Sequence, residues 1–430
     1  MMPPSPMAAI RAVEHGAGVR RNQLTQLVIA GARAEALRLC HTMFAEGDDP
    51  IRFLDDRFMD CLRGQDIHRA GEYAALLSTL LWGSQWLREE DGPPVFPNQT
   101  RVFLTASKLR HDWEQISYLR ARGILGDQFE PILAHYQKLI EAMRPAGRET
   151  PREVPTPLDP ENSARIGHVY NRILHRRSTP RVPRALSASW SAGQVEDEYL
   201  ASRCGIAIVD EFLSRDALES LRLFCLESTV WSGNRYNHGR LGAFFRDGFN
   251  CPLLLQVAEE LRDALPRVIG RNYPLQQLWA FKIGQPLPAD STIHADFAAI
   301  NVNFWITPTS ANRDESSGGM VIYDAQAPLN WNFDFYNGNL DAIGAYLQRK
   351  QASSIRVPYR QNRAIIFNSD LFHATEAVDF DPDYENHRIN ITMLFGYRHQ
   401  DMHHLDSRLD PAAPRPALGA SGWRSAAFRR

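Results

Sequence analysis

The chain has 430 residues, more than one typical domain, and this length predicts about two or three domains. Hydrophobic residues make up 44%, charged residues 23%, and the formal net charge is −2. These values are ordinary for a globular protein and give no general attraction to nucleic acid or to an anionic membrane surface. We therefore expect neither nucleic acid nor a membrane among the partners of this protein.

The cysteine pattern and the N-terminus both favour a cytoplasmic protein. The five cysteines are scattered and form no C-x-x-C pair, so neither a thiolate metal site nor a redox pair is expected. The first residues, MMPPSPMAAIRAVEHG, contain no apolar stretch of the kind found in signal peptides. No apolar run reaches the length of a membrane span.

Residues 1–144 are predicted to form a helical, repeat-like domain. The segments AGARAEALRLCHTMFAEGDDP and GQDIHRAGEYAALLSTLLWG carry apolar residues at helical spacing, and each contains an early glycine. Gly31 and Gly64 are separated by about the period of tetratricopeptide-type helical hairpins. Because such arrays present extended surfaces, we expect this region to bind a peptide, a protein or a second subunit.

Residues 145–198 differ in composition and are predicted to be a linker or an irregular wrap. The segments PAGRETPREVPTPLDPENS and RRSTPRVPRALSASWSAG are rich in Pro, Ser and Arg. Proline lacks an amide hydrogen and disfavours helix, which argues against long regular elements here. Tyr170 and Trp190 indicate that parts of the segment pack on a domain.

Residues 199–405 are predicted to form a mixed domain that becomes almost entirely β-structure after Tyr273. A strand-like run, CGIAIVDEFL, precedes two amphipathic helices, SRDALESLRLFCLE and CPLLLQVAEELRDALP. Seven short strand-like segments follow, with one helix, NLDAIGAYLQRKQ, among them. Many short strands separated by turn residues predict a sandwich or barrel, so the whole chain has an α+β multidomain organisation. Residues 406–430 are expected to be a mobile tail.

The segment STIHADFAAINVNFWITP, residues 291–308, contains the first indication of chemistry. His294 and Asp296 are either ordinary turn residues or two ligands of one metal ion. In an extended segment, residues two apart point to the same side, so this imidazole and carboxylate can converge. With a second histidine they would complete the facial triad of two histidines and one carboxylate that binds non-haem Fe(II). His373, which opens a later strand, is the best third ligand.

Arg388 is placed to bind a carboxylate beside such a metal. It opens the strand RINITMLFGY, on which Arg388, Asn390 and Thr392 share one face and apolar residues the other. Guanidinium groups bind carboxylates through two parallel hydrogen bonds, so an inward arginine suits a dicarboxylate ligand.

The ordered set His294-x-Asp296, His373 and Arg388 resembles the signature of the Fe(II)/2-oxoglutarate-dependent dioxygenases. The segment FNSDLFHATEAV is also similar to the one that carries the distal histidine in prolyl-hydroxylase-like and phytanoyl-hydroxylase-like members. The resemblance covers roughly residues 199–400. It implies a double-stranded β-helix (jelly-roll, cupin-like) domain, with Fe(II), 2-oxoglutarate and O2 as cofactor and co-substrates.

The resemblance also implies roles for individual residues. His294, Asp296 and His373 would be the catalytic iron ligands, and Arg388 would bind the distal carboxylate of 2-oxoglutarate. Asn303, which faces inward on its strand, either contacts the cofactor or serves packing within the sheet. Lys282, on the strand before the iron motif, is a weaker candidate for a cofactor contact. Trp279, Phe297 and Trp305 either line the substrate site or belong to the core.

The expected reaction is hydroxylation of an unactivated C–H bond, with release of succinate and CO2. A small residue replaces the carboxylate ligand in halogenating members, so Asp296 favours hydroxylation. We expect the substrate to be a peptide, an amino-acid-derived molecule or a natural-product intermediate. Two alternatives remain open: a helical interaction protein with an inactive barrel, and a cupin-type metalloenzyme that does not use 2-oxoglutarate. Arg388 distinguishes the second alternative, because without 2-oxoglutarate it would need another anion.

Overall fold

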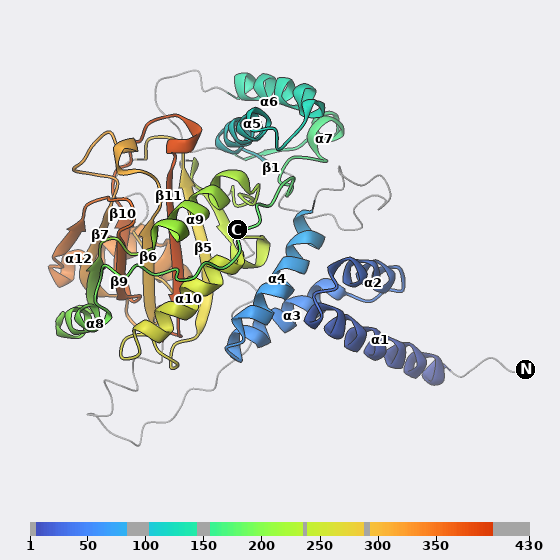
Figure 1. The fold of residues 1–430 in the computed structure, drawn as a ribbon, viewed down its shortest axis with the longest axis horizontal. Coiled ribbons are helices and arrows are strands. Elements are labelled where there is room, and N and C mark those ends of the chain that lie inside the picture. The colour runs from blue at the N-terminus through green and yellow to red at the C-terminus, as the bar shows by residue number, and fades with distance from the viewer. Residues whose placement is uncertain (1–5, 84–102, 144–154, 235–238, 288–292, 399–430) are drawn as a thin grey trace, which may run out of the picture.

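A computed structural model describes residues 6–83, 103–143, 155–234, 239–287 and 293–398 of the chain (Figure 1). The tail predicted at 406–430 lies outside these residues, as does the predicted domain boundary at 144–145.

The N-terminal residues form helices, as their periodicity predicts, and lie at one side of the molecule (Figure 1). In chain order they are α1 (Pro6–Ile29), α2 (Arg33–Ala45), α3 (Pro50–Arg63) and α4 (Ile67–Trp82). The side chains of Asp49 and Asp66 accept hydrogen bonds from Arg52 N and Arg69 N, so each caps the start of its helix. Helix α1 packs on α2 and α3 on α4. Their membership of a tetratricopeptide-like repeat stays a prediction.

A second helical group with its own core follows. It contains the short strands β1 (Phe103–Leu104) and β2 (Thr156–Pro157) and the helices α5 (Ala106–Ala121), α6 (Glu130–Ala142) and α7 (Pro160–Ile166). Phe129, Tyr136 and Tyr170 are buried in its centre. The predicted single helical domain is therefore two helical groups with separate cores. The region predicted as a linker supplies α7 and also α8 (Ala192–Ala201).

Two antiparallel sheets form the C-terminal part. The six-stranded sheet has the order β3 (Ile206–Val209), β9 (Ala364–Asn368), β6 (Ile300–Trp305), β11 (Arg388–Phe395), β5 (Leu275–Ile283) and β4 (Leu241–Phe244). The three-stranded sheet has the order β10 (Leu371–Thr375), β7 (Met320–Gln326) and β8 (Ser354–Val357). All seven strands expected after Tyr273 form, whereas β4 was not expected. The description as a double-stranded β-helix stays a prediction.

The space between the two sheets is filled by apolar side chains from both. Trp305 and Phe367 from the large sheet belong to the same buried cluster as Ile322 and Val357 from the small one. The register of the large sheet assigns its two faces. Arg388 pairs with Ile283 and Asn390 with Trp305, so these four residues share the inner face with the cluster.

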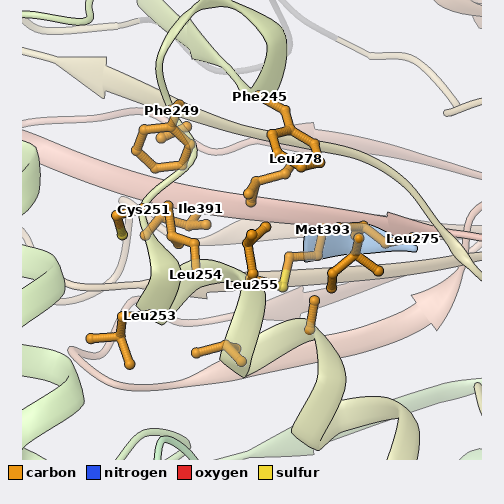
Figure 2. Packing of buried hydrophobic residues seen from close by; sticks show 14 of the residues in the cluster. Phe245, Phe249, Cys251, Leu253, Leu254, Leu255, Leu275, Leu278, Ile391 and Met393 are labelled. Atoms are coloured by element: carbon orange, nitrogen blue, oxygen red, sulfur yellow. The ribbon is translucent and has the colours of Figure 1, made fainter. Parts of the chain in front are cut away.

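The outer face of the large sheet is covered by α9 (Arg215–Glu227) and α10 (Pro252–Ala264). Figure 2 shows Leu254 and Leu255 of α10 packed near Ile391 and Met393 of β11. The same buried cluster includes residues of α1 to α4. A Cβ atom added at Gly71 of α4 would lie 2.7 Å from Leu255 Cδ1. The first four helices and the sheet domain thus share one continuous core.

An insertion between β7 and β8 holds α11 (Phe333–Gly338) and α12 (Leu340–Lys350). Arg398 fastens the start of this insertion. It pairs with Asp370, donates to the carbonyl oxygens of Ala327 and Pro328, and lies 4.2 Å from the centroid of the Tyr336 ring. None of the helices within the described ranges is both long and apolar enough to cross a membrane.

Candidate metal centre

The structure brings His294, Asp296 and His373 together. His294 Nε2 lies 3.8 Å from Asp296 Oδ1, and His373 Nε2 lies 3.5 Å from Asp296 Oδ2. One potential ligand atom from each residue lies within 4.8 Å of the other two. Among the described residues this is the one such group of three or more histidine, cysteine or acidic side chains.

Strand pairing positions the two histidines. His294 N donates to His373 O at 3.0 Å, and His373 N donates to His294 O at 2.8 Å, forming an antiparallel bridge. Asp296 N donates to Ser369 O in the turn before β10. The intervening Ala295 is held by α11, because its N–H donates to Tyr336 O and its carbonyl accepts from Asn337 Nδ2. Backbone contacts therefore fix this loop from both sides.

Hydrogen bonds also orient the ligand atoms. His373 Nδ1 lies 2.9 Å from Leu371 O, which requires a proton on Nδ1 and leaves Nε2 bare toward Asp296. Asn301 Nδ2 donates to Asp296 Oδ2 at 2.6 Å and holds the carboxylate in place. Two imidazoles and a carboxylate on one face form a donor set that suits Fe(II). The residues present therefore fit the metal that the motif implies.

The three side chains differ in their exposure to solvent. The side chain of His294 is 25% exposed, whereas those of Asp296 and His373 are 4% exposed. Burial is the largest influence and acts to raise the pKa of Asp296, but a proton on either imidazole, together with the hydrogen bond from Asn301, acts in the opposite direction and outweighs it. The pKa of Asp296 consequently lies below its ordinary value. A ligand approaching the centre would meet His294 first.

A chain of polar side chains connects Asp296 to Arg388 along the inner face of β6 and β11. Asn301 accepts at Oδ1 from Asn303 Nδ2. Asn303 Oδ1 accepts from Asn390 Nδ2 at 3.1 Å, and Asn390 Oδ1 accepts from Arg388 Nη1 at 3.2 Å. Thr392 Oγ1 also donates to Asn303 Oδ1, at 2.7 Å. A continuous polar strip thus crosses an otherwise apolar interior.

Arg388 is a buried cation held mainly by neutral partners. It is 1% exposed, and its Nε donates to Gly318 O at 2.7 Å. No carboxylate of the described residues forms an ion pair with Arg388. Its Cζ lies 5.7 Å from the Trp305 ring centroid and 5.8 Å from that of Tyr359. Burial lowers the pKa of Arg388 to about 10, so the guanidinium remains charged at neutral pH.

The structure corrects the assignment of Lys282. Lys282 pairs with Ile389, so it points to the outer face of the sheet, opposite to Arg388. Its Nζ donates to Tyr384 Oη at 2.9 Å and to Cys225 O at 3.3 Å. Lys282 therefore does not reach the metal centre, and a cofactor contact from it was a wrong prediction.

The other predicted residues take different places. Asn303 lies in the polar strip, with its side-chain oxygen and nitrogen already bonded to neighbouring side chains. Trp305 is fully buried in the cluster between the sheets, so it packs in the core and does not line an open site. Trp279 and Phe297 are only partly buried, and their ring centroids lie 6.1 Å apart.

Sequence reasoning missed Asn337 and Arg398, which hold the loop around Ala295 and the insertion. Neither has a local signal, because each acts on residues far away in the chain. Asn301 could have been found, since it shares a strand face with Asn303 and follows Asp296 closely.

No family model and no curated protein matches the chain. Among solved structures, a prolyl-4-hydroxylase from Pseudomonas putida aligns with 13% identity and a TM-score of 0.30, covering 50% of this chain and 99% of that one. The alpha ketoglutarate dependent carbocyclase SnoK from nogalamycin biosynthesis aligns with 14% identity and a TM-score of 0.34, covering 54% and 97%. HygX from Streptomyces hygroscopicus, with nickel and 2-oxoglutarate bound, aligns with 9% identity and a TM-score of 0.31, covering 47% and 86%.

These solved structures belong to the superfamily that the sequence motif resembles. At such low TM-scores and identities they assign no activity to this chain. Any such assignment rests on the geometry of its own side chains.

Proposed function

We propose that this protein is an Fe(II)- and 2-oxoglutarate-dependent oxygenase that hydroxylates a C–H bond of a peptide, an amino-acid-derived molecule or a natural product. The observation that carries the proposal is the convergence of His294, Asp296 and His373 on one point, on the same interior as Arg388. Arg388, a buried cation that forms no ion pair with a carboxylate of the described residues, lies at the far end of a polar strip from the three candidate metal ligands. That pairing suits a ligand with a carboxylate at each end.

In this proposal, His294, Asp296 and His373 hold Fe(II), and Arg388 binds the distal carboxylate of 2-oxoglutarate. Bound iron and 2-oxoglutarate would supply the oxidising chemistry, in which O2 is consumed and succinate and CO2 are released. Asn301 keeps the Asp296 carboxylate oriented. The apolar cluster around Trp305 limits the access of water to the interior.

Arg388 also bears on the two alternative functions. A cupin-type enzyme without 2-oxoglutarate would leave this buried guanidinium needing another anion. A helical interaction protein with an inactive barrel would have no physical need for two histidines and an aspartate that converge on one point. Binding of a peptide, a protein or a second subunit by residues 1–144 remains a separate prediction.

The proposal is tested by anaerobic titration of the full chain with Fe(II) and then with 2-oxoglutarate. Chelation of the iron by 2-oxoglutarate gives a weak visible metal-to-ligand charge-transfer band. We expect this band in the parent protein, its loss at all concentrations in His373→Ala, and a need for much more 2-oxoglutarate in Arg388→Ala. His41→Ala, which alters a half-buried histidine of α2, is the matched control.

Each outcome has a distinct meaning. If Fe(II) binds and no band forms, the centre belongs to a metalloprotein that does not use 2-oxoglutarate. If Fe(II) binds equally to the parent and to His373→Ala, the assignment of the metal ligands is wrong.

A further inference from the structure

A row of five partly buried aromatic rings extends from the metal centre along the inner side of the large sheet. We call it the aromatic row; it consists of Phe333, Phe297, Trp279, Phe281 and Phe244. Successive ring centroids are 6.1, 6.1, 6.4 and 6.3 Å apart. Phe297, the second member of the row, directly follows the candidate ligand Asp296 in the chain, so the backbone of the row adjoins the centre.

The aromatic row is not part of the hydrophobic core. Four of its members, all except Phe333, are partly buried and lie outside the buried clusters formed by the described residues. Trp305 and Phe367, on the same sheet face, are by contrast fully buried. The four rings thus remain partly exposed instead of joining the buried clusters of the described residues. Adjacent rings are tilted or edge to face, which presents ring edges and faces that a flat conjugated ligand can match.

A glycine makes room for the end of the row. Gly242 of β4 pairs with Phe281, and a Cβ atom there would lie 2.9 Å from Phe244 and 3.2 Å from Phe281. Both rings can lie against the strand only because this position has no side chain.

A cation closes the row at the same end. The Cζ atom of Arg240 lies 4.5 Å from the centroid of the Phe281 ring. Arg240 immediately precedes β4, and extending the register of β4 with β5 by one residue places it opposite Ile283, which also pairs with Arg388. The two arginines thus flank Ile283 on the inner face, and the charge of Arg240 helps to lower the pKa of Arg388. Arg240 thus adds a second positive charge to this interior, which attracts anionic groups.

We infer that the aromatic row and Arg240 bind the substrate, and that the substrate carries an aromatic or extended conjugated ring system with a negatively charged group. This inference rests on the proposed function, in which Arg388 is occupied by 2-oxoglutarate. The rings would position the flat part of the substrate beside His294, the exposed side of the centre, and Arg240 would hold its anionic group.

The test measures binding, which needs no turnover. Three probes are titrated calorimetrically into the full chain without metal: 2-naphthoate, its uncharged analogue 2-naphthylmethanol, and the non-aromatic anion cyclohexanecarboxylate. We expect 2-naphthoate to bind most tightly. Trp279→Leu, Phe281→Leu and Arg240→Gln should each weaken it by about tenfold, while 2-naphthylmethanol should be insensitive to Arg240→Gln. Phe103→Ala, which alters an exposed aromatic residue of β1, is the control, and thermal melts check that each variant folds.

The inference is overturned if cyclohexanecarboxylate binds as tightly as 2-naphthoate, if none of the probes binds, or if folded row variants bind 2-naphthoate like the parent. Its failure is distinct from that of the proposed function. If the probes bind as expected but the Fe(II)–2-oxoglutarate band does not form, the aromatic row is a ligand site and the oxygenase assignment is wrong. The band without probe binding would mean the reverse.

Discussion

His294 and His373 exchange two backbone hydrogen bonds, and their imidazole centroids lie 4.4 Å apart. The main chain holds both residues in place independently of their side chains. Because these hydrogen bonds do not involve the imidazoles, we expect that either histidine can be replaced without loss of the fold.

We expect His294→Ala and His373→Ala each to abolish tight Fe(II) binding and to leave the folded state intact. The bridge persists in both variants because its hydrogen bonds come from the main chain. Anaerobic equilibrium dialysis measures the metal, and circular dichroism measures the fold. Loss of the native spectrum in both variants would show that the imidazoles support the fold, contrary to this view.

Asn301→Ala should weaken Fe(II) binding by about 10- to 100-fold, because Asp296 Oδ2 loses the amide that orients it. The matched control is Asn250→Ala, which removes another buried asparagine, one that donates to Phe245 O far along the chain from the metal ligands. Equal Fe(II) affinity in the parent and in Asn301→Ala would mean that the hydrogen bond from Asn301 does not affect metal binding by Asp296.

Lys282→Met should leave 2-oxoglutarate binding unchanged and should alter stability in a pH-dependent way. Burial lowers the pKa of Lys282 to about 7 from an ordinary value of 10.5, beside Glu114, His111, Asp112, Lys108 and His387. Between these two pH values the unfolded chain binds a proton that the folded chain has released, so the parent gains stability as the pH rises.

The free energy of unfolding of Lys282→Met, relative to that of the parent, should therefore fall by on the order of 3 kcal/mol between pH 7 and pH 10. Urea denaturation at the two pH values measures this difference. If this difference in free energy stays constant or rises with pH, the buried Lys282 does not have the lowered pKa on which the prediction rests.

Gly71→Val should destabilise the protein by about 1–3 kcal/mol, because the new side chain meets Leu255 across the contact between α4 and α10. Gly344→Val in α12 is the control, since a Cβ atom there has nothing within 4 Å. A single cooperative transition, shifted in Gly71→Val, would agree with the shared core of the N-terminal helices and the sheet domain. Unfolding of the helices alone would indicate that they form a separate unit.

Much of the fold could be predicted from local pattern. The alternation of strands such as RINITMLFGY and the helical period of SRDALESLRLFCLE are properties of a few neighbouring residues, and they are sufficient to indicate those elements. The convergence of His294 and Asp296 follows in the same way from their spacing along one extended segment.

The choice of face was decided by tertiary structure. Trp279 and Lys282 are an odd number of residues apart on β5, so a regular strand cannot point both toward the centre. Alternation alone does not say which of the two points inward. The pairing of β5 with β11 decides it, because Trp279 lies opposite Thr392 on the polar strip and Lys282 opposite Ile389 on the outer face.

The sequence by itself determined the types of the candidate ligands, their order and the strands on or beside which they lie, because these depend on local chain geometry. Only the tertiary structure decided that Asn301 supports Asp296, that Asn337 and Arg398 hold the metal loop and the insertion, and that the first four helices share the core of the sheet domain. Those contacts join residues that are remote in the chain or depend on side-chain direction. Their formation depends on register and packing across the whole molecule, which no local pattern records.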